Sequence, residues 1–261
     1  VSAYAQQYFS NALLNTDEGK AIGFSYSKES GFNKQTIEKL QLGYNHDSRS
    51  KYTDAALKEG YRKEFLVKTG LTIERDNGTL LDRFYGRVIF PIHSLSGRVI
   101  GFGGRTLKSD KNIAKYLNSP ESEIYIKSNT LYGIYFAKQQ ISRLQKCYLV
   151  EGYTDVISMY QAGIENVVAS SGTSLTTEQI KLISRFTNNV TVLYDGDSAG
   201  IKASLRGIDM LLEQGMNIKV ALLPDGEDPD SYARAHTADE FRTFLDTNEA
   251  DFITFKINLL L

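Results

Sequence analysis

CYLVEGYTDV (residues 147–156) joins a short apolar run to an acidic residue, and TVLYDGDSAG (191–200) and ALLPDGEDPD (221–230) repeat this pattern. Each apolar run is typical of a buried strand. Their acidic residues would meet at one edge of a sheet; these are Glu151, Asp195, Asp197, Asp228 and Asp230. Carboxylates gathered in this way repel one another unless a cation joins them, and Mg²⁺ or Mn²⁺ suits oxygen ligands. The pattern therefore indicates divalent-metal chemistry on phosphate.

The fold around these strands is predicted from the alternation of elements between residues 148 and 223. Four apolar strand-like runs alternate with helical patterns over TDVISMYQAG, TTEQIKLISRF and AGIKASLRGIDMLLEQG. Alternating strands and helices imply a parallel sheet covered by helices, in which ligands bind beyond the carboxyl ends of the strands. The fold class is therefore α/β in this region.

The first half of the chain has a different pattern of predicted helices and strands. Helical spacing over residues 1–75 predicts three or four short helices. From residue 76 to 127 the pattern changes to strands and turns, with a hairpin signal in DNGTLLD and β-branched runs in RVIFPI and RVIGFG. Residues 128–145 return to a helical pattern, so the sequence predicts a mixed α and β region before the sheet.

Composition excludes several classes of protein. The 261 residues are 41% hydrophobic, which is enough for a folded core, and contain one cysteine, Cys147. A single cysteine rules out a disulfide framework or a cysteine-based zinc site within this chain and favours an intracellular location. No apolar stretch approaches the roughly 18 residues that span a bilayer. The missing initiator Met leads us to expect a fragment of a longer protein.

Charge is distributed unevenly although lysine and arginine total 30 against 31 acidic residues. Between residues 83 and 127 there are eight basic residues and three acidic ones, whereas residues 148–235 contain twelve acidic and six basic. A cationic segment beside an acidic one is what a polyanion and a metal ion together require.

Each acidic motif also has a purely structural interpretation. Asp195 and Asp197 are typical of an Asp-Gly turn followed by a helix cap, and Glu151 alone would be an ordinary surface carboxylate. Asp155 suits the first turn of a helix, where it complements the helix dipole. Asp228 and Asp230 are plausible caps in DGEDPDSYARA. The joint occurrence of two strand-end acids favours the metal site.

The basic segment leaves similar alternatives open. GRVIGFGGRT (97–106) would let phosphate approach its backbone beside Arg105, but it lacks the spacing of the dinucleotide or Walker A loops. A glycine-rich bend in a twisted sheet is the alternative. Interleaved aromatic residues would stack bases or, more commonly, fill a core.

These motifs together resemble a known family. VEGYTDV, ASSGT and YDGDSAG resemble the Toprim fold of primases, topoisomerases and some nucleases. RVIFPI, GRVIGFGGR, KYLNSPE, LYGIYFAK and LPDGEDPD, in this order, resemble the bacterial DnaG-type replicative primases from about residue 20 to 235.

The resemblance implies an RNA polymerase core in three parts. These are a mixed α/β basic subdomain (1–127), a Toprim subdomain with a parallel sheet (128–225) and the start of a helical subdomain (226–261). It implies catalytic metal ligands at Glu151, Asp195 and Asp197, with Asp155, Asp228 and Asp230 as second choices. It assigns nucleotide or nucleic-acid binding to Arg83, Arg105, Lys115, Asn118 and Lys127.

The implied activity is the synthesis of short RNA primers from ribonucleoside triphosphates on single-stranded DNA, with Mg²⁺ or Mn²⁺. We expect a monomer at the bacterial replication fork in the cytoplasm, with no membrane association. Zinc is expected only in an amino-terminal domain outside this chain, and contact with the replicative helicase only through a carboxyl-terminal region outside it. Template selection by this piece should then be impaired.

One departure and two alternatives accompany the resemblance. Ser30 stands where the family commonly has an arginine, so a nucleotide contact is in question, and the sequence leaves open whether Lys28 replaces that arginine. A Toprim nuclease or topoisomerase fragment would cleave DNA with the same carboxylates. A non-catalytic recombination module would bind single-stranded DNA without metal. The primase-like strings of the basic segment argue against both.

Overall fold

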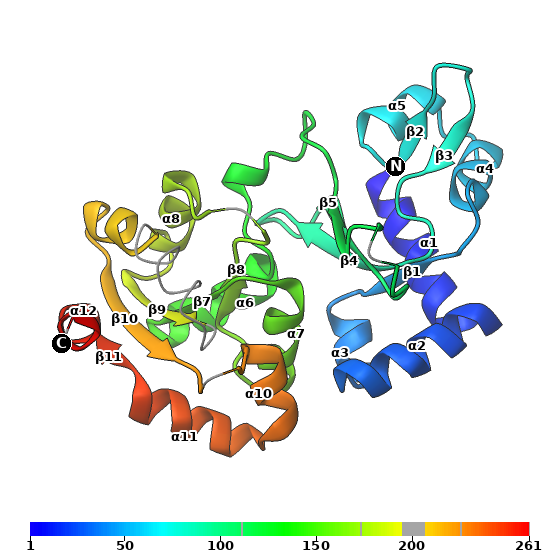
Figure 1. The fold of residues 1–261 in the computed structure, drawn as a ribbon. Coiled ribbons are helices and arrows are strands. Elements are labelled where there is room, and N and C mark those ends of the chain that lie inside the picture. The colour runs from blue at the N-terminus through cyan, green and yellow to red at the C-terminus, as the bar shows by residue number, and fades with distance from the viewer. Residues whose placement is uncertain (111, 173, 195–206, 225, 261) are drawn as a thin grey trace. The chain divides into compact units, whose positions relative to one another are not determined.

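The computed structural model describes residues 1–110, 112–172, 174–194, 207–224 and 226–260, which form two compact units divided between Ile126 and Lys127 (Figure 1). Both units combine helices with strands, and the second contains the predicted parallel sheet. Among the described residues, no helix has the length and apolarity needed to cross a membrane.

The first unit begins with helices and ends in antiparallel strands. Its helices are α1 (Ser2–Asn15), α2 (Asp17–Ser30), α3 (Lys34–Lys39), α4 (Lys51–Lys58) and α5 (Lys63–Lys68). Its strands are β1 (Gly43–Asn45), β2 (Thr72–Glu74), β3 (Leu80–Asp82), β4 (Arg87–His93), β5 (Val99–Thr106) and β6 (Tyr116–Asn118). Five described helices exceed the three or four that helical spacing predicted.

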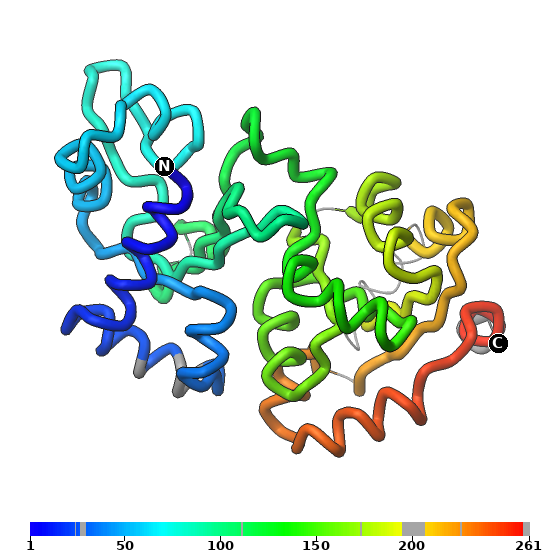
Figure 2. The backbone as a smooth tube through the Cα atoms, turned by 180° about the vertical axis from the view of Figure 1, so that it is seen from behind, coloured from blue at the N-terminus to red at the C-terminus, as the bar shows by residue number. Residues whose placement is uncertain are grey.

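The junction of α1 and α2 shows why the first two helices are separate. Thr16 adopts an extended conformation after α1, and its hydroxyl accepts the N–H of Gly19 at 3.0 Å. A threonine that satisfies a free N–H in this way begins a new helix. The chain therefore turns sharply between the two blue helices (Figure 2).

The first unit contains a four-stranded antiparallel sheet of order β1-β4-β5-β6. β4 is buried along its whole length, and its turn into β5 closes with the N–H of Ser94 bonded to the carbonyl of Arg98 at 2.9 Å. The β2–β3 hairpin confirms the hairpin signal in DNGTLLD, and β4 and β5 contain the two predicted β-branched runs. β1 and β6, of three residues each, were not predicted, because such short runs carry little periodic signal.

α1 packs against this sheet through an aromatic core. Phe9, Tyr52, Phe84 and Phe102 are at most 1% exposed and belong to one cluster. Burying each such side chain contributes about 1.5–3 kcal/mol. Gly43 permits the close approach, because a Cβ there would lie 2.6 Å from the Cβ of Phe9.

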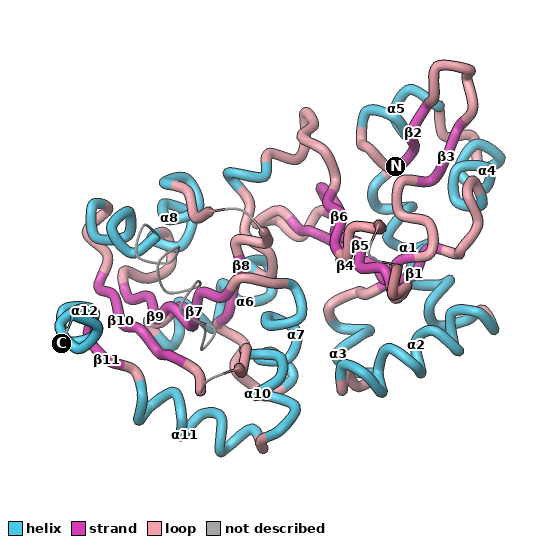
Figure 3. The backbone as a smooth tube through the Cα atoms, viewed as in Figure 1, coloured by secondary structure: helices cyan, strands magenta, loops and turns pink. Residues whose placement is uncertain are grey.

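The second unit alternates helix and strand (Figure 3). Its helices are the short 3₁₀ turn η1 (Lys127–Asn129) and α6 (Ile134–Leu144), α7 (Tyr153–Gln161), α8 (Thr177–Ser184), α10 (Pro229–Ala235), α11 (Ala238–Asn248) and α12 (Phe252–Leu260). Its strands are β7 (Cys147–Val150), β8 (Val167–Ala169), β9 (Asn189–Tyr194), β10 (Asn217–Leu222) and β11 (Ala250–Asp251). Residues 207–213 are also helical.

The sheet of this unit has the order β11-β10-β9-β7-β8. β7, β8, β9 and β10 are mutually parallel, which confirms the predicted parallel α/β arrangement. β11 joins β10 in the antiparallel direction and was not predicted. The helix predicted over residues 128–145 begins only at Ile134, because Gly133 has a left-handed conformation (φ 85°).

Candidate functional site

The carboxyl ends of the parallel strands lie at one edge of the sheet in the second unit. Leu149 of β7 pairs with Val192 of β9, and Leu222 of β10 pairs with Tyr194. Glu151 directly follows β7, so it lies at this edge beside the end of β9. Ligands of parallel α/β sheets bind beyond this edge.

Glu151 has the properties of an available metal ligand. Its side chain is exposed and has no hydrogen-bond or ion-pair partner among the described residues. Its position is held through the backbone, where its carbonyl accepts the N–H of Ser171 at 3.0 Å. Asp195 and Asp197 follow Tyr194 in the sequence and lie outside the described residues.

Asp155 and Asp228 serve as helix caps. An Oδ atom of Asp155 accepts the N–H of Gly152 at 2.8 Å, at the start of α7. Asp228 precedes Pro229 of α10, and its carboxylate accepts the N–H of Ser231 at 2.6 Å. These contacts match the structural alternative that the sequence offered for both residues.

Asp230 is buried between α10 and α7. Ser158 of α7 donates a hydrogen bond to Asp230 at 2.5 Å, and the guanidinium of Arg234 lies 3.5 Å from the other carboxylate oxygen. The aspartate therefore fastens α10 to α7, which lie beside one another in Figure 1.

The fit of a divalent cation to these residues can be judged in the described part of the chain. No group of three or more His, Cys, Asp or Glu side chains there could hold a metal ion. Of the candidate ligands that the structure describes, Glu151 is the exposed one, and its carboxylate oxygens are of the kind that Mg²⁺ or Mn²⁺ binds. The ligand set predicted from sequence therefore fits at Glu151, and its other two members are outside the described residues.

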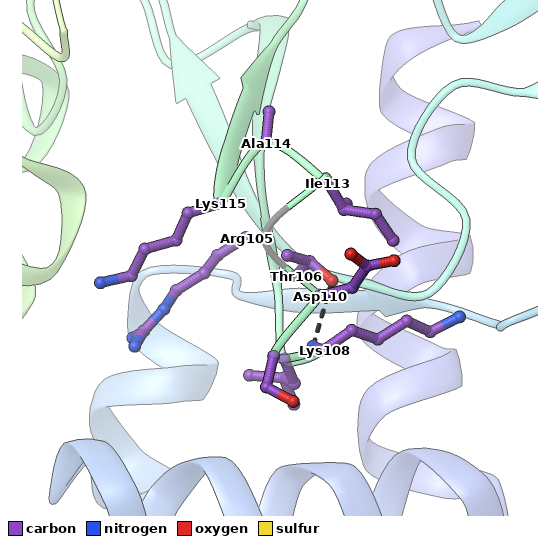
Figure 4. A pocket seen from close by; sticks show the side chains of 9 residues that line it. Arg105, Thr106, Lys108, Asp110, Ile113, Ala114 and Lys115 are labelled. Atoms are coloured by element: carbon purple, nitrogen blue, oxygen red, sulfur yellow. Dashed lines mark hydrogen bonds between the residues drawn. The ribbon is translucent and has the colours of Figure 1, made fainter.

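Three basic residues of the first unit, Arg105, Lys108 and Lys115, line a cavity of about 510 Å³ between the end of β5 and the start of β6. Arg105 and Lys115 extend from it in the same direction, whereas Lys108 points the other way (Figure 4). Lys108 forms an ion pair with Asp47 at 2.8 Å. Two adjacent cations in one cavity are suited to an anion such as phosphate.

Arg105 is oriented by aromatic rings. Its guanidinium carbon lies 5.4 Å from the ring centroid of Tyr26 and 6.0 Å from that of Tyr116. One guanidinium nitrogen donates to the Tyr26 hydroxyl at 3.4 Å. Burial raises the pKa of Tyr26 to about 12, although Arg105 acts in the opposite direction. The phenol therefore stays protonated beside the cation.

Sequence reasoning did not identify Tyr26. Its only signal was an aromatic residue in a helical pattern, which is far more often core than site. Ser30, where the resemblance expected an arginine, is buried at the end of α2 one turn after Tyr26. The side chain of Lys28 lies outside the described part.

Arg83 and Asn118 lie near the turn that follows β6. Arg83 has a buried Nε with no hydrogen-bond partner among the described residues, and burial lowers its pKa. A Cβ on Gly70 would lie 3.6 Å from this Nε and 2.2 Å from Cδ of Pro120. Asn118 is paired with Gly103 of β5, two residues along the strand from Arg105.

Lys127 belongs to the second unit, as the first residue of η1. Its ammonium donates to the carbonyl of Gly172 at 3.4 Å, in the loop after β8. It is therefore close to the loop that follows the carboxyl end of β8. Arg87, also in the basic segment, is buried and donates to the carbonyls of Gly104 and Lys115, which gives it a structural role.

The parallel strands β7 to β10, with an exposed glutamate directly after β7, define an α/β class of protein whose ligands bind beyond the strand ends. Residues 148–233 match the Toprim-like family, and residues 8–138 match the family described as DNA primase catalytic core, N-terminal domain. The chain belongs to the family of bacterial DnaG-type DNA primases, of which it represents the catalytic-core region.

Individual relatives agree with this assignment. A DNA primase of Halalkalibacterium halodurans is 40% identical over 98% of this chain, which spans 43% of that relative. The RNA polymerase domain of Mycobacterium tuberculosis primase DnaG matches with a TM-score of 0.90 and 32% identity, over 99% of this chain and 85% of that one. A DnaG primase catalytic domain bound to single-stranded DNA matches with a TM-score of 0.87 and 34% identity, over all of this chain and 83% of that one.

Proposed function

We propose that this chain is the DNA-dependent RNA polymerase core of a primase, which joins ribonucleoside triphosphates into short RNA primers on single-stranded DNA. The observation that carries the proposal is the exposed carboxylate of Glu151 at the carboxyl edge of the parallel sheet in a primase-family chain. The relatives named DNA primase and the neighbour bound to single-stranded DNA support it. The chain spans less than half the length of those curated relatives.

Glu151, Asp195 and Asp197 would hold Mg²⁺ or Mn²⁺. When bound, the cation lowers the pKa of the attacking 3′-hydroxyl and offsets charge on the triphosphate. The backbone bond from Ser171 fixes the strand end at Glu151, so the backbone from which this carboxylate extends is held in place. Asp155, Asp228 and Asp230 are second choices as ligands, because their described contacts already assign them to helix termini and to the α7–α10 contact.

The basic residues bind phosphates in this proposal. Arg105 and Lys115 converge at one cavity and would hold a triphosphate or a template phosphate. Arg83 and Asn118 would contact the nucleic-acid backbone, and Lys127 would contact phosphate at the sheet edge. Such contacts make single-strand affinity fall as salt rises.

Further partners are proposed from the family alone. The bacterial relatives imply that the chain acts as a monomer at the replication fork in the cytoplasm. Zinc and the replicative helicase would bind to regions of a longer protein outside this chain.

Incorporation of labelled ribonucleotides on excess single-stranded template with Mn²⁺ tests the activity. Glu151→Gln and Asp195→Asn should each reduce incorporation by about a hundredfold or more, because the metal loses a charged ligand. Glu213→Gln is the matched control, since Glu213 is an exposed glutamate at the end of the 207–213 helix, before β10. Nicking of DNA in place of synthesis would indicate the nuclease alternative, and metal-independent binding without synthesis would indicate the recombination module.

The phosphate contacts are tested by the salt dependence of single-strand binding. Lys115→Ala should reduce the slope of log affinity against log salt by about 0.7, the value of one lost phosphate contact. Lys108→Ala should leave the slope unchanged, because Lys108 points away and pairs with Asp47. Equal slopes for both variants would contradict the role given to Lys115.

A further inference from the structure

The start of α8 reaches across to the turn that carries Lys127. The hydroxyl of Thr176, the N-cap of α8, donates to the carbonyl of Ser128 at 2.5 Å. The side-chain amide of Gln179 donates to the carbonyl of Thr130 at 2.8 Å and to that of Lys127 at 3.4 Å. Two side chains of one capping box therefore bind three backbone carbonyls in and directly after η1, those of Lys127, Ser128 and Thr130.

The side chain of Gln179 is buried and forms hydrogen bonds through both its oxygen and its nitrogen. It is 0% exposed, and its Oε1 accepts the N–H of Thr176 at 3.1 Å. The N–H of Gln179 in turn donates to the hydroxyl of Thr176 at 3.2 Å. A buried amide that uses both its oxygen and its nitrogen is a rigid connector, because any movement leaves a buried polar group unsatisfied.

The turn connects onward to the edge of the sheet. The ammonium of Lys127 donates to the carbonyl of Gly172, and the neighbouring Ser171 donates its N–H to the carbonyl of Glu151. Hydrogen bonds, with one step along the chain from Gly172 to Ser171, therefore link Gln179 to Lys127, to the loop after β8 and to the backbone of Glu151. All of these residues belong to the second unit.

We propose that Gln179 and Thr176 are positioning residues, which hold η1 so that the ammonium of Lys127 lies at the carboxyl edge of the sheet and binds a phosphate group there. The inference deepens the proposed function and rests on it. Lysine is a flexible point charge, so a fixed backbone beneath it reduces the entropy lost when it meets phosphate. Neither Gln179 nor Thr176 touches the phosphate itself.

A double-mutant cycle tests the proposal on the whole chain. Lys127→Ala and Gln179→Met are made singly and together, and the KM for ribonucleoside triphosphate and the Kd for single-stranded DNA are measured for each. Gln179→Met should weaken binding about three- to tenfold, and it should weaken the same one of the two affinities, for nucleotide or for DNA, that Lys127→Ala weakens. The double variant should match Lys127→Ala alone, since residues that act as a unit are not additive. A change in KM would identify the phosphate as that of the nucleotide, and a change in Kd would identify it as that of the template.

Controls separate this role from a general loss of stability. Gln140→Met removes another partly buried glutamine amide of the same unit, one that bonds to Glu165, and should leave both affinities unchanged. Thr176→Val should weaken the same affinity as Gln179→Met, and Thr176→Ser should restore it, because serine retains the hydroxyl. The two Thr176 variants test the positioning role even if Gln179→Met does not fold.

The outcomes distinguish the two proposals. If Lys127→Ala changes neither affinity, the proposed role of Lys127 fails and the positioning role fails with it. If Lys127→Ala weakens binding but Gln179→Met and Thr176→Val do not, only the positioning inference is overturned. Additive losses in the double variant would also overturn it.

Discussion

The guanidinium carbon of Arg105 lies 5.4 Å from the ring centroid of Tyr26, and one of its nitrogens donates to the Tyr26 hydroxyl at 3.4 Å. The tyrosine comes from α2 and the arginine from β5, so a residue of the helical segment orients a cation at the end of the sheet. The orientation of Arg105 therefore depends on how α2 packs.

Tyr26→Leu should weaken nucleotide or single-strand binding about three- to tenfold, because a cation–π contact contributes about 0.5–2 kcal/mol. Tyr26→Phe keeps the ring and should bind nearly as the parent does. Equilibrium binding measures both variants, and thermal unfolding checks that each is folded. Equal losses from Phe and Leu would show that the hydroxyl, not the ring, orients Arg105.

Gly70→Ala should destabilise the first unit by about 2–4 kcal/mol, because the new Cβ would overlap Pro120 at 2.2 Å in a left-handed conformation (φ 68°). Gly78→Ala is the matched variant, since Gly78 also has a left-handed conformation but nothing lies within 4 Å of its Cβ position. It should cost only about 1 kcal/mol. Urea unfolding gives both free energies. Similar losses of stability in the two variants would mean that the turn at Pro120 moves aside for the new Cβ at little cost.

Glu249→Gln should lower the stability of the second unit at pH 7 by about 1–3 kcal/mol. The Glu249 carboxylate accepts from Lys146 at 2.6 Å, from Lys219 at 2.7 Å and from the Thr191 hydroxyl at 3.1 Å. Burial alone would raise the pKa of Glu249, but the hydrogen bonds from the two lysines outweigh it, so this pKa lies below its usual value.

A lowered pKa fixes the sign of the pH dependence. The stabilisation by Glu249 is fully present above the unfolded pKa of about 4.3 and is lost as pH falls through the lower pKa of the folded state. The gap in melting temperature between parent and Glu249→Gln should therefore close as pH falls below about 4. A gap independent of pH would contradict the ionised state of Glu249, and Glu213→Gln should show no gap at any pH.

Asp228→Asn should keep both fold and activity, because asparagine caps a helix about as well as aspartate. Glu151→Gln, also a loss of one charge, should abolish most incorporation. The comparison of the two by the ribonucleotide assay separates a helix cap from a metal ligand. A loss at Asp228 as large as that at Glu151, with unchanged melting temperature, would assign Asp228 to the metal.

The parallel sheet was predictable because short apolar, β-branched runs alternate with helical patterns, and β7 and β9 are each followed directly by an acidic residue. The edge strand β11 was not, since two residues carry no periodicity and their partners in β10, Lys219 and Val220, lie about thirty residues earlier in the chain. Glu151 was found from its place at a strand end. Tyr26, Thr176 and Gln179 were not, because their partners lie 79, 48 and 52 residues away along the chain.

The sequence also showed that each acidic residue could be a helix cap, but it could not decide between a cap and a metal ligand. Caps and metal ligands use the same residue types at the same strand-to-helix junctions. Only the contact distances of Asp155, Asp228 and Asp230 separate them from Glu151 in the described structure.

The antiparallel additions at the two sides of the parallel sheet have a consequence for association. β11 pairs with the outer side of β10, and Tyr132 forms an antiparallel bridge with Ala169 on the outer strand β8. Outer strands with unpaired backbone are templates on which a second chain can add a strand and begin aggregation. Because short segments of its own chain occupy part of both borders, this sheet is guarded against growth by strand addition while the carboxyl ends of its strands stay accessible.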